Sequence, residues 1–481
     1  MNFLSDTVVL SRMQFALTAM FHIIFPVLTT GMGIYLVVIE ALWLKTRKSD
    51  YYHHARFWSK FYVLNFGVGV ATGIPMEFQF GTNWAPFSDA VGNFFGSVIG
   101  FEASWAFMLE AAFLGIMLFG WERVNPAIHF LSTVLVAVGA NLSTVWIITA
   151  NSWMVTPAGG ELVDGKFMVS DYFRAIANPS ALVSVTHMFV ATLETSLFVI
   201  GGISAWYILR QRNTEFFAKS LKVVLATLIA IAPFQIYMGH LSAEIAYRYQ
   251  PAKLAAMEAQ WETLPAGKPA DWTLLAIPNN RTEKNDWELS IPGALGYILE
   301  FKPNLSEPVL GLKEWTPNNR PRLVGLIYYS FRIMIGIGFF LAAMAAISAL
   351  QWMRGKLKND NIAQQKWLMR AWVFSAPLGY IAVETGWIVR CNGRQPWTLY
   401  DRIRTSDSAS HIPATNVLTS LICFATVYAL LGVAYLYFGS RIVRKGPNLE
   451  LPVPGVDLDR PAIDTTPAEF QPDDRPVEAQ Q

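Results

Sequence analysis

Several acidic residues stand in long apolar stretches of the chain, where an ionisable side chain is costly. They include Glu77, Glu102, Glu110, Glu194 and Glu384. A charged group deep in a bilayer is strongly disfavoured unless it is paired or functional. Glu102 and Glu110 are eight residues apart, which places them about 80° apart around a helix and about 12 Å apart along it. That spacing suits a proton relay bridged by water or another side chain, and equally two carboxyls hydrogen-bonded to neighbouring helices.

Other residues in these stretches have the chemistry of metal ligands. His22 and His187 could bind iron through neutral imidazole or be satisfied core residues. Met334 is a soft thioether, which raises the potential of a haem when paired with histidine, although a lone membrane methionine usually packs in the core. Arg332 lies nearby, and a buried guanidinium favours a carboxylate partner such as a haem propionate. Glu384 fits either a carboxylate ligand to iron or a packed structural acid.

The composition indicates a helical membrane protein. Of the 481 residues, 53% are hydrophobic and 15% charged, against about 45–50% and about 25% in soluble proteins, and the mean hydropathy is +0.33. The net charge of +2 gives nucleic-acid binding no electrostatic support. Two cysteines, Cys391 and Cys423, exclude a disulfide framework and a cysteine-built metal cluster.

Nine apolar stretches predict an all-α, polytopic membrane fold with about nine transmembrane helices. The loops after the first, fifth, seventh and ninth are rich in Lys and Arg, whereas the loop 81–96 has neither. The positive-inside rule therefore places the N-terminus outside and the C-terminus in the cytoplasm. Arg394 is an exception in an outside loop, which indicates either a bound anion such as a cofactor carboxylate or a solvated surface. The stretches lie near Phe15–Leu42, Phe57–Phe80, Ser97–Gly120, Ala127–Ser152, Ala181–Leu209, Leu221–Gly239, Leu323–Met353, Ala371–Arg390 and Ala414–Phe438.

These stretches divide the chain into four regions. Residues 1–240 form a six-helix membrane region and residues 323–446 a three-helix membrane region. Between them, 241–322 is polar and extracytoplasmic, and too long for a passive turn. Residues 447–481 are rich in Pro and Asp and predict a disordered cytoplasmic tail.

Five strings of sequence together resemble subunit I of cytochrome bd-type quinol oxidases. The resemblance extends over all nine stretches and the polar segment, up to about Gly446. The polar segment lacks a long insertion, so the chain is similar to the short quinol-loop subgroup, which includes cyanide-insensitive forms. The strings are Leu10–His22, Gly73–Trp84, Gly202–Tyr207, Phe331–Met334 and Gly393–Trp397.

The resemblance implies a terminal respiratory oxidase of the bacterial inner membrane. Such an enzyme oxidises membrane quinol, reduces dioxygen to water, and generates a proton gradient by charge separation without pumping. It implies three haems, held by residues 1–240 and by the helices after the polar segment. A low-spin, b558-like haem b would be held by His187 and Met334, with Arg332 beside it. His22 and Glu384 would each ligate one of two high-spin haems, a b595-like haem b and either a haem d or a further haem b.

The family also implies roles for other polar residues. Glu102 matches a carboxylate at the high-spin pair, Glu110 one in a proton path towards it, and Glu77 another carboxylate near these haems. Lys253 and Glu258, in the quinol-binding segment 241–322, match residues implicated in quinol oxidation, and Glu258 could serve as the base.

Three further residues complete the family's expectations. Arg394 lies in the last matching string and would bind a cofactor. Asn151 matches a polar residue of a proton route. Tyr380 stands where members commonly carry a Trp, at a step of electron transfer between haems.

The family pairs this chain with a second integral subunit and often with a small single-span one. Two other functions are open to a chain with buried carboxylates. A secondary transporter fits poorly, because no internal repeat is visible. A haem-free assembly partner would be marked by loss of the ligand residues, all of which are present.

Overall fold

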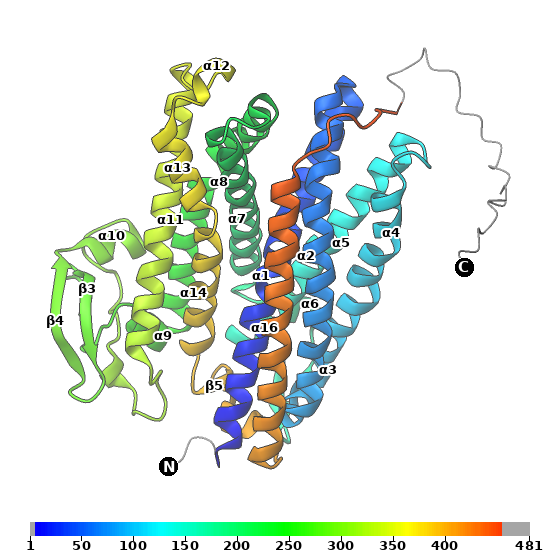
Figure 1. Ribbon diagram of the computed structural model, residues 1–481. Helices are drawn as coiled ribbons and strands as arrows, with labels where there is room; N and C mark the ends of the chain where they lie inside the picture. Colours follow the sequence, from blue (N-terminus) through cyan, green and yellow to red (C-terminus); the bar gives the residue numbers. More distant parts are fainter. Residues whose placement is uncertain (1–4, 455–481) are drawn as a thin grey trace, which may run out of the picture.

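The structure is a computed structural model that describes residues 5–454, with the backbone alone at positions 359 and 360. Long helices run side by side in one bundle, and a smaller unit with α9, α10, β3 and β4 leans against it (Figure 1). Of the predicted disordered tail, residues 447–454 follow the last helix as irregular chain, and 455–481 lie outside the described residues.

Each of the nine predicted stretches is helical. The eighth is split, because Pro377 has no backbone N–H to donate and disfavours the helical conformation of the residue before it. The helices are α1 (Thr7–Thr46), α2 (Ser49–Thr82), α3 (Ala85–Phe101) continued by η2 (Glu102–Phe107) and α4 (Met108–Phe119), α5 (Pro126–Val155), α7 (Ala181–Leu209), α8 (Thr214–Tyr249), α11 (Val324–Met353), α13 (Lys366–Ser375) with α14 (Leu378–Asn392), and α16 (Ala414–Lys445).

Seven of these helical segments, among the described residues, are long and apolar enough to cross a membrane. They are all but α2 and the split α13–α14. The predicted membrane fold of packed helices is therefore confirmed, while the number nine and the sides of the two termini stay predictions. Strands occur only as three antiparallel hairpins within the described residues: β1 (Gly160–Val163) with β2 (Lys166–Val169), β3 (Trp272–Asn279) with β4 (Lys284–Ile291), and β5 (Trp397–Leu399) with β6 (Ile403–Arg404).

Local signals in the sequence explain several helix ends. Asp6 caps α1 by accepting hydrogen bonds from the backbone N–H groups of Val8 and Val9, at 2.9 and 3.1 Å. Asn125 caps α5 in the same way, and Pro126 occupies the first helical position, where its missing N–H is not needed. These caps fix where the first and fifth helices begin.

The segment 241–322 is a folded unit rather than an open loop. Its first residues continue α8, which runs to Tyr249, ten residues past the predicted end at Gly239. It then contains α9 (Pro251–Met257), the β3–β4 hairpin, α10 (Ala294–Glu300) and the short η3 (Leu312–Glu314). Its apolar side chains share one core with Phe331 of α11 and Val389 of α14. The unit is therefore docked on the membrane helices that carry several candidate ligands.

The remaining described helices are short. They are α6 (Tyr172–Ile176), α12 (Asn359–Ile362) and α15 (Thr405–Ser408). His53 and His54 fall between the first two predicted stretches, where the sequence predicts a loop. They lie instead inside α2 and are buried, because this helix begins at Ser49, before its apolar stretch.

Candidate functional site

Three of the predicted carboxylates form one cluster beside α5. Glu102 begins the π-helix η2, a local widening of the helix that is often found at functional sites. Its carboxylate accepts a 2.5 Å hydrogen bond from the hydroxyl of Ser143. Glu77 and Glu110 each lie near enough to Glu102 for their charges to interact with it. The structure thus brings together residues that are 25 and eight positions from Glu102 in the chain.

Glu110 has a partner that sequence reasoning missed. The hydroxyl of Tyr62, on α2, donates a 2.7 Å hydrogen bond to its carboxylate, and both side chains are buried. The close approach of α5 depends on Gly139, since a Cβ there would meet Glu110 at 3.0 Å. The cluster is therefore held between α2, α4 and α5.

His22 on α1 is hydrogen-bonded through one ring nitrogen. Its Nδ1 lies 3.0 Å from the hydroxyl of Thr72, which is also 2.8 Å from the carbonyl of Val68. When that hydroxyl donates to Val68 it accepts from Nδ1–H, and neutral imidazole then carries its lone pair on Nε2. Gly73 makes room for the ring, because a Cβ there would lie 3.0 Å from His22 Cε1. This tautomer suits a metal ligand.

The other three candidate ligands lie on helices that pack around one another. His187 is on α7, Met334 on α11 and Glu384 on α14; α14 contacts both α7 and α11. Nδ1 of His187 and Oε2 of Glu384 are buried without a hydrogen-bond partner. The sulfur of Met334 faces Gly386, where a Cβ would lie only 3.0 Å away. Unsatisfied buried polar atoms are rare, so these side chains fit a group that is still to be bound.

Three cations, two of them buried and Arg390 half-buried, lie close together where the segment 241–322 meets the bundle. Lys253 of α9 is 6% exposed and donates to the side-chain oxygen of Gln250. Its carbon chain packs on Gly393, where a Cβ would lie 2.7 Å from Cγ. Arg390 and Arg394 act on it electrostatically, and burial first, then these guanidiniums, hold the pKa of Lys253 well below its usual range.

This cation cluster, Lys253, Arg390 and Arg394, has no carboxylate partner among the described residues. Nη2 of Arg390 and both Nε and Nη1 of Arg394 are buried without a hydrogen-bond partner. An uncompensated buried charge is strongly destabilising, so the cluster needs an anion. The two carboxylates of a haem fit this need in charge and in donor chemistry.

Arg390 was not among the predicted site residues. It donates to the side-chain oxygens of Asn151 and Ser184, the latter at 3.1 Å, and its charge acts on His187. The available signal was an arginine at the end of a predicted span. Asn151, the expected proton-route residue, is therefore a hydrogen-bond partner of this cluster.

Arg332 forms an ion pair with Glu258 of the segment 241–322, so only part of its guanidinium is left for a haem propionate. Its Nη2 lies 2.6 Å from Oε2 of Glu258, and the two side chains are 10% and 4% exposed. Nη2 and Nε also donate to the carbonyls of Thr273 and Leu274, at 2.7 and 3.2 Å. Nη1 is buried without a partner. The end of α9 thus places Glu258 on Arg332, five residues after Lys253.

Tyr380 and Glu194 lie apart from these hydrogen-bonded groups. Tyr380 is half-buried on α14, after Gly379, where a Cβ would meet the hydroxyl of Thr195 on α7 at 2.5 Å. Glu194 is buried in α7. The close packing of α7 on α14 at Gly379 therefore fixes the position of the helix turn that carries Tyr380.

Sequence reasoning also missed Glu40, a buried acid on α1. Glu40 lies 3.1 Å from Nδ1 of His129 and accepts from the hydroxyl of Thr133 at 2.9 Å. Nε2 of His129 bonds the carbonyl of Met117 at 2.9 Å and so carries a hydrogen. The pair Glu40–His129 therefore shares one proton, whichever of the two holds it. Glu40 stood in an apolar stretch and carried the same signal as the other acids.

Comparisons with known proteins agree on one family. The family model of cytochrome bd terminal oxidase subunit I matches residues 10–447. Cytochrome bd-II ubiquinol oxidase subunit 1 of Escherichia coli is 35% identical over 92% of this chain and 97% of its own length. Cytochrome bd ubiquinol oxidase subunit 1 of Bacillus subtilis is 34% identical over 91% and 94%. The solved structure of bd oxidase from Geobacillus thermodenitrificans superposes with a TM-score of 0.84 at 30% identity, covering 93% of this chain and 100% of that one.

Proposed function

The chain belongs to the cytochrome bd terminal oxidase subunit I family, and from this premise we propose how its residues divide the work of quinol oxidation and dioxygen reduction. The chain is a quinol oxidase subunit of the bacterial inner membrane. The observation that carries the proposal is the set of buried polar atoms left without partners at the candidate ligands and in the cation cluster.

His187 and Met334 would hold a low-spin haem b, and His22 and Glu384 would each hold a high-spin haem, one b and the other d or b. A haem held by both His187 and Met334 would supply iron that carries electrons, and the haems held by His22 and by Glu384 would supply the iron chemistry of dioxygen reduction. The hydroxyl of Thr72 that holds Nδ1 of His22 and the unpartnered Oε2 of Glu384 support these assignments.

The cation cluster would anchor and orient a haem through its propionates. Lys253, Arg390 and Arg394 present a lysine amine and two guanidiniums, and a guanidinium binds a carboxylate with two parallel hydrogen bonds. Lys253 comes from the docked unit and the two arginines from α14 and the turn after it. Haem binding would therefore also fix the position of the docked unit.

Glu258 would accept the proton that quinol loses on oxidation. Its partner Arg332 holds the carboxylate at the junction of α9 and α11. A base must lie within hydrogen-bond reach of the proton that it takes, so Glu258 marks where the quinol head would bind. Lys253, five residues earlier in the same unit, would hold a propionate.

Glu102 and Glu110 would deliver protons for the formation of water. The hydroxyl of Ser143 fixes Glu102, and that of Tyr62 fixes Glu110. If protons are released by Glu258 on the outer side and taken up through Glu110 from the inner side, charge separates across the membrane without a pump.

A partner subunit would complete the face formed by α3, η2 and α4. Trp105 is 65% exposed and Met108 58% exposed on this face, close to Glu102. A large apolar face beside a half-buried carboxylate needs cover to keep water and lipid away from the carboxylate. The second integral subunit that the family implies would supply that cover, and a small single-span subunit could join it.

Substitution of the low-spin ligands tests the proposal. His187→Ala and Met334→Ala should each abolish the low-spin haem b bands of the reduced complex, and intact bands in both variants would contradict the assignment. Gly386→Ala is a subtler change, because its Cβ would lie 3.0 Å from the Met334 sulfur. It should displace that sulfur and shift the same bands. Gly336→Ala on α11, where a Cβ meets nothing within 4 Å, is the matched control.

A further inference from the structure

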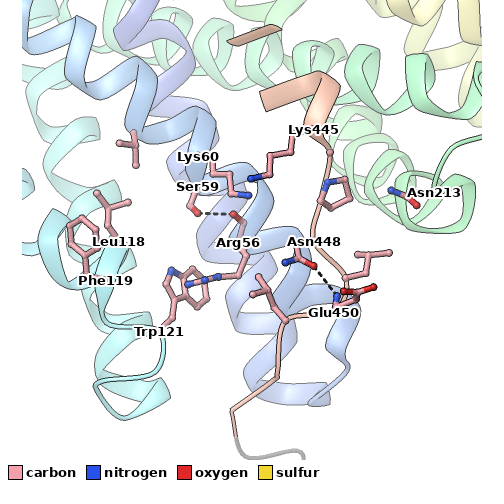
Figure 2. A pocket seen from close by; sticks show the side chains of 15 residues that line it. Arg56, Ser59, Lys60, Leu118, Phe119, Trp121, Asn213, Lys445, Asn448 and Glu450 are labelled. Atoms are coloured by element: carbon pink, nitrogen blue, oxygen red, sulfur yellow. Dashed lines mark hydrogen bonds between the residues drawn. The ribbon is translucent and has the colours of Figure 1, made fainter. Parts of the chain in front are cut away.

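A pocket of about 880 Å³ opens at the end of the bundle that carries the basic loops, and no residue of the docked unit lines it. It lies between the first turns of α2, the end of α4 and the chain that follows α16 (Figure 2). It is large enough for a charged head group together with the start of an acyl chain. None of the candidate ligands lines it.

Cations outnumber acids among the residues that line this pocket. Arg56, Lys60 and Lys445 face it, and Glu450 is the one acid among the residues that line it. Figure 2 shows the ends of Lys60 and Lys445 pointing toward one another. Lys445 and Arg56 are the charged groups that act on Lys60. None of the three cations has a carboxylate within salt-bridge distance among residues 5–454.

Arg56 is held in place for a ligand rather than left to move in solvent. Its guanidinium lies over the ring of Trp121 at 5.3 Å and over that of Tyr52 at 6.0 Å. Cation–π contacts of this kind orient the guanidinium without neutralising its charge. Two lysines that face one another beside an oriented arginine repel unless an anion lies between them.

One wall of the pocket is apolar and is formed by the end of α4 with Val63 of α2. Phe119 at the end of α4 is 68% exposed, and Leu118 and Val63 line the pocket beside it. A free phosphate ion needs no such wall, whereas a lipid places its first methylene groups against one. Basic pockets between transmembrane helices at the cytoplasmic end bind anionic head groups.

We propose that this pocket binds the phosphodiester head group of an anionic phospholipid through Arg56, Lys60 and Lys445, with the start of an acyl chain against Phe119. Two other occupants share some of this chemistry. One is inorganic phosphate. The other is this chain's own acidic segment 455–481, which begins just beyond the described residues and contains Asp457 and Asp459.

Lipid binding by the purified, delipidated oxidase complex tests the proposal. Native mass spectrometry would follow a titration with phosphatidylglycerol and, in parallel, with phosphatidylcholine of the same acyl chains. The double variant Lys60→Gln with Lys445→Gln should bind phosphatidylglycerol about 30-fold more weakly at one site, as expected for two basic groups at a membrane surface. Phosphatidylcholine should bind weakly to both forms.

The matched control is Lys356→Gln with Lys358→Gln, which removes two exposed lysines that follow α11 and should leave the tight site unchanged. Equal affinities in the two double variants would overturn the proposal. Displacement of the lipid by an equal concentration of inorganic phosphate would assign a phosphate site instead. A chain ending at residue 454 should bind like the full chain; binding only after that truncation would make the acidic segment the natural occupant and overturn the lipid assignment.

Discussion

Replacing Glu258 by Gln should impair quinol oxidation, because it removes both the proposed base and the ion pair with Arg332, and the loss of the pair sets the minimum effect. The pair is 2.6 Å apart and nearly buried. Removing one partner of a buried ion pair costs about 3–5 kcal/mol. Arg332 keeps the carbonyls of Thr273 and Leu274 and lies over the ring of Tyr328 at 4.7 Å, so the cost falls below that range. A charged hydrogen bond contributes about 1.5–3 kcal/mol, and we take about 2 kcal/mol, which is about 30-fold in kcat/KM.

A double-mutant cycle measures this coupling. Steady-state kcat/KM for quinol would be compared in Glu258→Gln, Arg332→Met and the combination, with haem content measured for each. We expect Arg332→Met to cost about 30-fold and Glu258→Gln at least as much, and the combination to cost little more than Glu258→Gln alone, because both changes remove the same pair. Glu262→Gln, whose side chain is 72% exposed, should behave like the unchanged enzyme. Losses that multiply in the combination, with normal haem content, would refute the reasoning.

Two further predictions concern the carboxylate cluster and the cation cluster. Tyr62→Phe removes the hydroxyl that donates to Glu110 and should slow turnover about tenfold, while the rate at which quinol reduces the haems without oxygen stays the same. Tyr35→Phe is the control, because it loses a buried hydrogen bond to Ser220 instead. An equal effect of both changes would rule out a specific role for Tyr62. Burial and neighbouring guanidiniums lower the pKa of Lys253, and a bound propionate raises it again, so haem binding takes up a proton and weakens as the pH rises. Haem transfer to apomyoglobin should therefore accelerate as the pH rises above the lowered pKa that Lys253 has in the haem-free form. Lys253→Met should remove that acceleration, and its full persistence in this variant would contradict the assignment.

The helices could be predicted because apolar length is a local property of the sequence. The stretch Ala181–Leu209 coincides with α7. The sixth stretch was placed too short, since α8 continues to Tyr249. This extension is polar, and contacts with the docked unit hold it: His240 bonds the carbonyl of Ile298 at 2.7 Å. Hydropathy identifies the part of a helix that can lie in lipid, and it gives no signal for a polar part of the same helix that continues beyond the membrane.

The candidate residues could be predicted singly, but their grouping could not. Glu258 and Arg332 are 74 positions apart, and Lys253 meets Arg390 only because α9 docks on the end of α14. A pattern within one helix carries no information about such contacts. Glu40 is different, because an acid in an apolar stretch could be recognised from the sequence, whereas its contact with His129 could not.

The central claim is that this chain carries haem at the ligands described above. A dithionite-reduced minus air-oxidised optical spectrum of the purified complex, with extraction and typing of the haem, tests it most directly. We predict haem b bands, with a red-shifted chlorin band if the third haem is d and without it if that haem is b. A spectrum without haem bands, from a complex that extraction also shows to be haem-free, would contradict the account and every ligand assignment in it.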